Sequence, residues 1–170
     1  MTRATVAIDI KAPAALVFAL SSRVERWDAL LPHYARSRIV ERRADGSLLV
    51  EFVARRPLMG IIGLGLPVIW RAMTWNDPTR LELRFVHVAG PTRGMDVTWR
   101  IEAEGTDSRV SIEHVFLPGV PGFGAFVDRW FTRPIAGRTL ATFKTLAEAL
   151  ADDRAPGPES DPLPAANQRL

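Results

Sequence analysis

The clearest pattern in the chain is an amphipathic helix near its C-terminal end. Apolar residues recur at steps of four and three over residues 134–150, which places them on one helical face; they are Ala136, Leu140, Phe143, Ala147 and Leu150. Thr132 stands at a suitable N-cap position, and Pro134 is tolerated in a first helical turn. A helix of this length must bury its apolar face, so the sequence predicts a packing partner elsewhere in the chain.

Most of the sequence before this helix alternates between apolar and polar residues with a period of two, which is typical of β-strands. Strands are predicted over residues 3–11, 34–43, 47–55, 68–75, 80–88, 95–104 and 109–116. Short turns such as Asp45-Gly46 separate them, and this spacing favours a meandering antiparallel sheet. Two short helices, over residues 13–20 and 24–31, follow the first strand. The predicted fold is α+β, with a curved sheet wrapped around one long C-terminal helix.

Two segments leave alternatives open. Residues 57–67 are apolar and glycine-rich, and they lack the Gly-Lys-Ser/Thr sequence of a phosphate-binding loop. They form either a buried connection or an apolar lid over a pocket. Residues 121–133 form either a separate short helix or the beginning of the long helix, kinked at Pro134.

The composition is that of an ordinary globular domain. With 170 residues, 47% of them hydrophobic, the chain can build one domain with a substantial core. The absence of cysteine excludes disulfides, cysteine metal sites and thiol nucleophiles. After Leu150, proline, alanine and charged residues dominate, so we expect one domain over residues 1–151 and a disordered tail over residues 152–170.

Targeting signals and charge narrow the location and the partners. The N-terminal sequence MTRATVAIDIK contains an acidic residue and no long apolar core, so it does not read as a signal peptide. The longest apolar run, residues 57–70, is shorter than the roughly 20 residues of a spanning helix. We therefore expect a cytoplasmic protein without a membrane span. The net charge of +3 comes from scattered arginines, so nucleic acid is not an expected partner.

Two histidines stand out among the polar residues. His87 and His114 fall on the inward-facing positions of predicted strands, among leucine, isoleucine, valine and phenylalanine. Three interpretations remain open: a core histidine bonded to the backbone, a cavity histidine that binds a ligand carbonyl, or a metal ligand. A metal site needs a third ligand, and His33, the remaining histidine, lies in a predicted loop. We expect no metal and no cofactor.

Three stretches of the sequence resemble one known family. They are IDIKAPAALVFALSSRVERWDALLPHY, FVHVAGPTRGMDVTWRIEAEGTDSRVSIEHVF and IAGRTLATFKTLAEAL, and together they span residues 4–150. They are similar to the polyketide cyclase/dehydrase family of the START-like (SRPBCC, Bet v 1-like) superfamily. The resemblance implies a helix-grip fold, in which a seven-stranded antiparallel sheet and the C-terminal helix enclose an elongated hydrophobic cavity.

The resemblance also implies functional residues. Tyr34 matches the tyrosine that orients the substrate in aromatic polyketide cyclases, and Arg71 is matched to the arginine that polarises a substrate carbonyl; both are the implied catalytic residues. Trp27 matches a tryptophan at the cavity mouth. With Trp99, His87 and His114, which face inward by strand parity, it forms the predicted ligand-binding set.

One part of the chain departs from the cyclase pattern. The apolar glycine-rich insertion within residues 56–70 leaves the orientation of Arg71 open. An inward Arg71 would need a carboxylate or a ligand as partner, because a buried unpaired arginine is costly. If Arg71 points outward, the catalytic analogy fails.

The implied function is a polyketide cyclase/aromatase-like protein. It would bind a hydrophobic or aromatic small molecule and promote aldol cyclisation and dehydration, with an acyl-carrier protein as a possible partner. A non-enzymatic lipid or quinone carrier needs the same cavity and is the first alternative. A ribosome-associated interaction module that uses the external arginines is the second.

Overall fold

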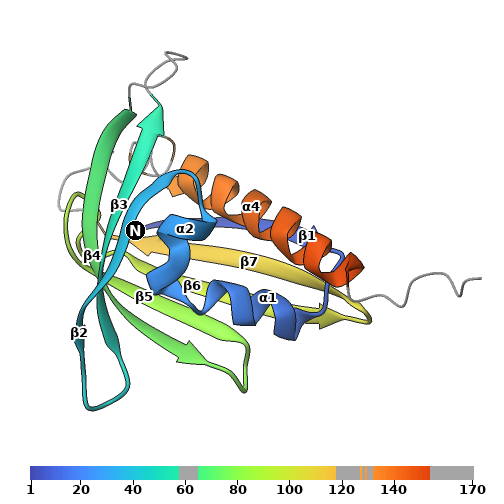
Figure 1. The fold of residues 1–170 in the computed structure, drawn as a ribbon. Helices are drawn as coiled ribbons and strands as arrows, with labels where there is room; N and C mark the ends of the chain where they lie inside the picture. The colour runs from blue at the N-terminus through green and yellow to red at the C-terminus, as the bar shows by residue number, and fades with distance from the viewer. Residues whose placement is uncertain (58–64, 118–126, 128, 130–131, 154–170) are drawn as a thin grey trace, which may run out of the picture.

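The computed structural model describes residues 1–57, 65–117, 127, 129 and 132–153 of the chain. Strand β1 (Thr2–Ile10) is followed by α1 (Ala14–Ser21), the 3₁₀ helix η1 (Val24–Arg26) and α2 (Trp27–Leu30). The next strands are β2 (Tyr34–Arg42), β3 (Leu48–Pro57), β4 (Gly65–Asp77), β5 (Glu82–Ala89), β6 (Asp96–Glu104) and β7 (Asp107–Phe116). The long helix α4 (Arg133–Asp152) comes last (Figure 1).

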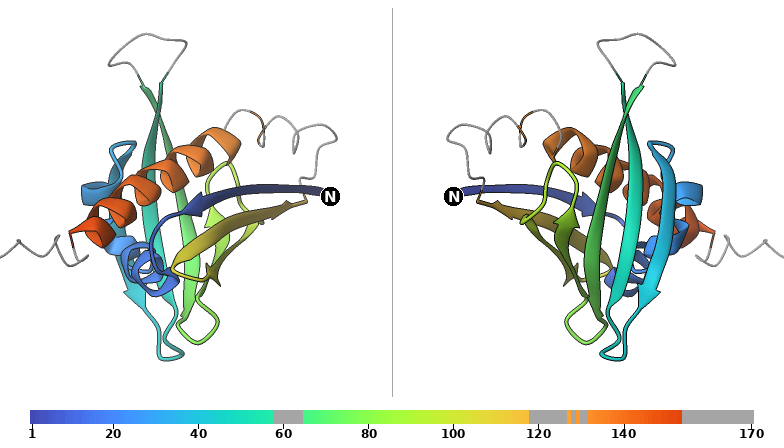
Figure 2. Two further views of the ribbon diagram at one scale, coloured as in Figure 1. Left: turned by 90° about the vertical axis from the view of Figure 1, so that its right-hand side faces the viewer. Right: turned by 90° about the vertical axis from the view of Figure 1, so that its left-hand side faces the viewer.

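The strands form one seven-stranded antiparallel sheet in the order β1-β7-β6-β5-β4-β3-β2. Neighbouring strands from β2 to β7 are consecutive in sequence, as expected for a meander. Strand β1 is an edge strand and pairs with β7. Figure 2 shows the sheet curving around α4, with α1 and α2 beside the helix. The predicted α+β helix-grip fold, with two short helices after the first strand, is confirmed.

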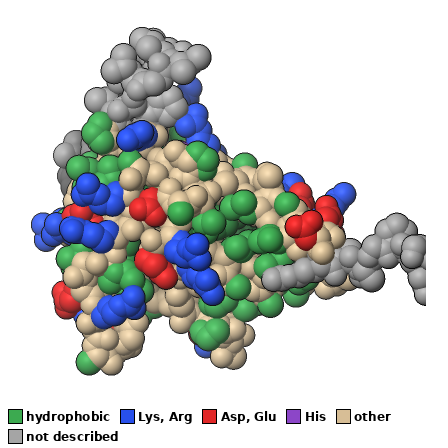
Figure 3. All heavy atoms as spheres, viewed as in Figure 1, with side chains coloured by type: hydrophobic (Ala, Val, Ile, Leu, Met, Phe, Trp, Pro, Cys, Tyr) green, Lys and Arg blue, Asp and Glu red, His purple; other side chains and the backbone are tan. Residues whose placement is uncertain are grey.

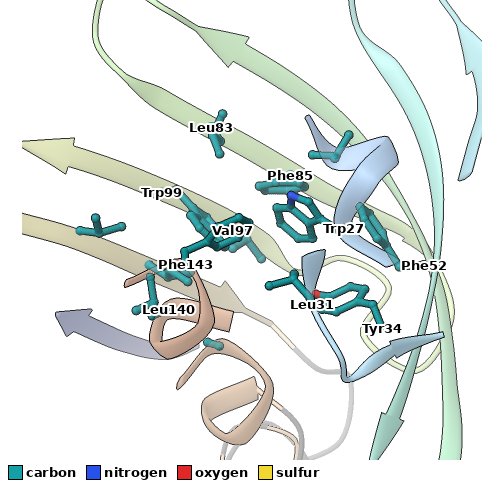
Figure 4. Packing of buried hydrophobic residues seen from close by; sticks show 14 of the residues in the cluster. Trp27, Leu31, Tyr34, Phe52, Leu83, Phe85, Val97, Trp99, Leu140 and Phe143 are labelled. Atoms are coloured by element: carbon teal, nitrogen blue, oxygen red, sulfur yellow. The ribbon is translucent and has the colours of Figure 1, made fainter. Parts of the chain in front are cut away.

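The core lies between the concave face of the sheet and α4. Ala136, Leu140, Phe143 and Ala147 are buried on the predicted face of the helix. Figure 4 shows Leu140 and Phe143 beside Trp99. Thr132 is the residue at the N-terminal end of α4, but its side chain makes no capping hydrogen bond.

Strand alternation follows the predicted parity in the centre of the sheet. The inward residues of β6 and β7 are buried; they are Val97, Trp99, Ile101, Val110, Ile112, His114 and Phe116. In β4 the pairing with β5 shifts by one residue between Arg71 and Ala72. Trp70 is buried, whereas Trp75 is 38% exposed on the outer face.

The loop after β5 crosses close to β4. Gly90 has a φ of +96°, and a Cβ atom there would lie 2.5 Å from the backbone oxygen of Ile69. Only glycine fits this approach, because any side chain would collide with the backbone. The close approach brings Thr92, which follows in the same loop, to the concave side of the sheet.

Some expectations fall on residues outside the described ranges. They concern most of the lid or buried connection at residues 57–67, most of the short helix at residues 121–133, and the tail, of which residues 154–170 are not described. Helix α4 extends to Asp152. None of the helices in the described ranges is long and apolar enough to span a membrane.

Candidate ligand-binding cavity

A cavity of about 80 Å³ lies between the sheet and the N-terminal half of α4. Residues of α2, α4, the strands β2 to β7 and the β5–β6 loop line it: Trp27, Tyr34, Phe52, Val68, Trp70, Phe85, His87, Thr92, Met95, Val97, Trp99, Ile112, His114, Thr132, Ile135, Ala136 and Thr139. Its volume is well below the roughly 300–1,000 Å³ of sites that enclose drug-sized ligands. Aromatic side chains fill much of the space between sheet and helix.

Trp27 is the centre of the aromatic wall. Its ring centroid lies 5.5 Å from those of Tyr34, Phe52 and Trp99, 5.6 Å from that of Phe85 and 6.0 Å from that of Phe143. The indole N–H donates to the backbone oxygen of Ser21 at 3.0 Å, so the buried polar atom is satisfied. The backbone at the end of α1 therefore fixes this ring, which lies among Phe85, Phe52 and Tyr34 in Figure 4.

One polar corner of the cavity forms where β2 begins beside α4. The Nε2 atom of His33 lies 2.9 Å from the hydroxyl oxygen of Thr139, and that hydroxyl donates to the backbone oxygen of Ile135 at 2.8 Å. Tyr34 and Thr139 both line the cavity. Burial raises the pKa of Tyr34 far above its usual value, so its phenol stays neutral. Burial and the nearby Arg138 lower the pKa of His33 to about 4.

The second polar corner lies at the end of β5. The Nδ1 atom of His87 lies 2.6 Å from the hydroxyl oxygen of Thr92, and the imidazole stacks on Trp70 with ring centroids 6.0 Å apart. His87 is partly buried, and His114 of β7, which is buried, also lines the cavity. Burial first, and then the charge of His114, lower the pKa of His87 to about 3. His87 is thus a neutral hydrogen-bonding group at physiological pH.

Arg71 lies outside the cavity. Its exposed guanidinium donates to the carboxylate of Glu51 on the outer face of the sheet, at 3.0 Å through Nε and 2.8 Å through Nη2. Arg36 and Arg38 approach the same carboxylate at 3.9 and 3.5 Å. Basic and acidic side chains gather over this part of the surface, β2 to β4 (Figure 3). Arg71 therefore points outward, which is the condition under which the catalytic analogy fails.

The structure brings the other predicted site residues together. Trp27, Tyr34, His87, Trp99 and His114 all line the cavity. No cluster of three potential metal-ligating side chains occurs within the described ranges.

Several lining residues were not predicted. They are Phe52, Trp70, Met95 and the threonines Thr92, Thr132 and Thr139. Strand parity could have identified Phe52 and Trp70, because both are buried residues of predicted strands. Nothing in the sequence indicates the contact of His33 with Thr139, because the two residues are 106 positions apart.

The sequence as a whole matches the family described as polyketide cyclase/dehydrase and lipid transport, over residues 1–148. The chain belongs to this family. Membership in the polyketide cyclase/dehydrase and lipid transport family implies a hydrophobic ligand, in agreement with the aromatic cavity. No curated protein matched the sequence.

Solved structures of related fold include members with named activities. The protein TTHA0849 from Thermus thermophilus has a TM-score of 0.69 at 20% identity, over 88% of this chain and 99% of its own. The aromatase/cyclase Zhui from Streptomyces sp. R1128 has a TM-score of 0.65 at 17% identity, over 92% and 96%. These two similarities show the fold alone.

A third structure is slightly closer in sequence. The di-domain aromatase/cyclase BexL from the BE-7585A biosynthetic pathway has a TM-score of 0.65 at 25% identity, over 85% of this chain. The match covers 46% of BexL, so this family member spans about half the length of that di-domain protein.

The partly buried His87 makes the stability of this family member sensitive to acid. Because the pKa of His87 is lower in the folded state, the unfolded state binds the proton more tightly. The contribution of neutral His87 to the free energy of unfolding is therefore fully present above pH 6.5 and decreases as the pH falls below 6.5. At pH 5 the loss from His87 is about 2 kcal/mol, at about 1.4 kcal/mol per pH unit. Urea unfolding of wild type and His87→Gln at pH 7.5 and pH 5 measures this. Equal losses in both proteins would contradict it.

Proposed function

We propose that this protein binds a flat, apolar, ring-containing small molecule in the cavity beneath the N-terminal half of α4. The observation that carries the proposal is the wall of three tryptophans, Trp27, Trp70 and Trp99, with few polar groups beside them. Flat aromatic walls favour ring-containing ligands, and few polar groups fix their orientation. The family description, which includes lipid transport, supports the same class of ligand.

Binding of such a ligand requires side chains to move. A cavity of about 80 Å³ is too small for a polycyclic molecule, since an engineered cavity of about 150 Å³ holds benzene. Met95 lines the cavity and is unbranched, so it repacks at low cost. We therefore expect a ligand to displace Met95 before it displaces Trp27, whose indole is fixed by a hydrogen bond.

Cyclisation of a bound poly-β-keto chain is the second candidate function. The observation in its favour is the pair His87 and His114, two imidazoles in an apolar cavity. Aldol closure and dehydration need a shaped cavity and positioned proton donors and acceptors, not a covalent nucleophile. The position of Arg71 outside the cavity removes the group expected to polarise a carbonyl, so the structure supports binding more directly than catalysis.

Tryptophan fluorescence tests the binding proposal. Titration with quinones, flavonoids and fatty acids should quench or shift the emission, because Trp27, Trp70 and Trp99 line the cavity. Trp75→Phe removes an exposed tryptophan of the outer face and should leave the ligand response unchanged. An unchanged emission with every ligand, together with salt-dependent co-sedimentation with ribosomes, would favour the interaction-module alternative.

A reconstituted minimal polyketide synthase tests the second candidate. Its product profile is compared with and without the wild-type protein and its Tyr34→Phe and His87→Gln variants. A cyclase changes the profile, and one or both variants reverse that change. If wild type has no effect on the products, a carrier function remains.

Arg71→Ala should leave ligand affinity within about twofold of wild type. The guanidinium bonds to Glu51 on the outer face, so its removal costs roughly 0–1 kcal/mol of stability, as for surface ion pairs. Titration calorimetry with the best ligand from the fluorescence screen measures the affinity. A tenfold loss of affinity without a loss of stability would return Arg71 to the site.

A further inference from the structure

The second polar corner, formed by His87 and Thr92, has a defined direction of hydrogen bonding. The Nδ1 atom of His87 lies 2.6 Å from the hydroxyl oxygen of Thr92. Hydrogen bonds from a hydroxyl to oxygen span about 2.5–3.0 Å, whereas those from an N–H group to oxygen span about 2.7–3.2 Å. The short distance therefore favours the Thr92 hydroxyl as the donor and an unprotonated Nδ1 atom as the acceptor.

The hydroxyl proton of Thr92 supports the same direction. Thr92 is 8% exposed, and within the described ranges its hydroxyl has no hydrogen-bond partner other than Nδ1 of His87. If Nδ1 carried a proton and donated it, the hydroxyl proton of Thr92 would be buried without an acceptor, which is costly. Donation from Thr92 to Nδ1 avoids this cost.

The imidazole of His87 then carries its proton on the other nitrogen. Burial first, and then the charge of His114, hold the pKa of His87 at about 3, so the ring has a single proton at neutral pH. Because Nδ1 accepts, that proton lies on Nε2. His87 lines the cavity, and no described residue forms a hydrogen bond with its Nε2 atom, so the Nε2–H group is available to a ligand.

We propose that Thr92 holds His87 in the Nε2–H tautomer, and that this N–H group donates to a carbonyl oxygen of the ligand. The inference rests on the proposed ligand-binding function and adds a carbonyl to the class of ligand. A carbonyl oxygen suits the corner because it can only accept, and an N–H group left unpaired in an apolar cavity is costly. Aryl ketones combine such an oxygen with the flat ring that the tryptophan wall favours.

Thr92 acts as a positioning residue in this arrangement. Its hydroxyl fixes which edge of the imidazole faces the β5–β6 loop, and stacking on Trp70, with ring planes 25° apart, fixes the plane of the ring. The backbone N–H of His87 donates to the oxygen of Met95 at 2.9 Å, and its backbone oxygen accepts from Gly94 at 2.8 Å. The direction of the Nε2–H group is therefore set before a ligand binds, which lowers the entropic cost of the bond.

A measurement without ligand tests the tautomer. The ¹⁵N chemical shifts of the His87 ring at pH 8 distinguish the two tautomers, and His87→Gln identifies its signals. We expect the Nε2–H form in wild type and in Thr92→Ser. Thr92→Val should move the Nδ1 shift towards that of an acceptor nitrogen without a hydrogen bond. A predominant Nδ1–H form in wild type, or an Nδ1 shift unchanged in Thr92→Val, would overturn the inference and leave the proposed function intact.

Two single-ring probes test the ligand carbonyl by NMR titration. Acetophenone carries a carbonyl, and α-methylstyrene has the same shape with a CH2 group in place of the oxygen. His87→Phe keeps an aromatic ring beside Trp70 and should lower the ratio of acetophenone to α-methylstyrene affinities about fivefold, the size of one neutral hydrogen bond. Thr92→Val should lower the same ratio at least about twofold, whereas Thr92→Ser should retain it.

The ratio of the two affinities separates the hydrogen bond from packing. A variant that only loosens the cavity weakens both probes alike, so a ratio unchanged in His87→Phe would contradict the inference. Binding of both probes with that outcome would leave the proposed function intact. If neither probe binds to the wild-type protein, the proposed function fails, and the inference fails with it.

Discussion

Replacement of Trp27 by alanine is expected to lower the free energy of unfolding by about 3–5 kcal/mol, the range for large aromatic residues removed from cores. The ring is 4% exposed and packs against five other aromatic rings. Its removal would join a new void to the existing cavity, and α2 would lose the aromatic contacts that Trp27 makes with Phe52, Phe85 and Trp99 of the sheet. Urea unfolding followed by far-ultraviolet circular dichroism measures the change.

Trp75→Ala is the matched control for this prediction. Trp75 is 38% exposed on the outer face of β4, so its loss should cost no more than about 1 kcal/mol. Similar losses for the two variants would show that the aromatic cluster around Trp27 is not the centre of the core.

Ala136→Leu is expected to weaken ligand binding about a hundredfold, or about 2.7 kcal/mol, while the protein stays folded. Ala136 lies on α4, is buried and lines the cavity, so a larger side chain there would occupy the space that a ligand needs. Leucine is also a strong helix former, which limits the cost to α4. Titration calorimetry with the best ligand from the fluorescence screen measures the loss.

The adjacent position provides the control. A Cβ atom at Gly137 would meet no other atom within 4 Å, so Gly137→Ala should leave ligand affinity unchanged. It should also stabilise the protein by about 1 kcal/mol, because alanine replaces glycine in a helix interior. Equal affinities for Ala136→Leu and wild type would place the ligand elsewhere in the molecule.

The fold was predictable because alternation and periodicity report which side chains face the core. In β6 and β7 the inward residues, from Val97 to His114, have the burial that their parity predicts. The apolar stripe of α4 is buried from Ala136 to Ala147, and Leu150, which the same stripe includes, is 37% exposed at the helix end. These patterns can be read from residues that are close together in the sequence, so the fold could be predicted without knowledge of the contacts between distant residues.

The site was only partly predictable because it depends on contacts between distant residues. Parity predicts that His87, Trp99 and His114 face inward, and all three line the cavity. Arg71 is adjacent to a register shift in the β4–β5 pairing, and its partner Glu51 lies on β3. The outward direction of the Arg71 side chain therefore depends on how the strands pair, which the sequence around Arg71 does not show. The sequence pattern places His33 in a loop, and the partner that involves it in the site lies on α4.

The pairing of β1 with β7 has a consequence for how the chain folds. Thr2 pairs with Phe116 and Ile10 with Ser108, so the first strand finds its partner only after about a hundred further residues have been made. The backbone N–H of Lys11, just after β1, donates to the carboxylate of Glu148 on α4, and the ammonium group of Lys144 donates to the backbone oxygen of Asp9. Contacts of such long sequence separation slow folding, since loop closure precedes their gain in energy. During synthesis on the ribosome, β1 therefore has no native partner until β7 has emerged. Until then the backbone hydrogen-bonding groups of β1 are unpaired and can bond to other chains.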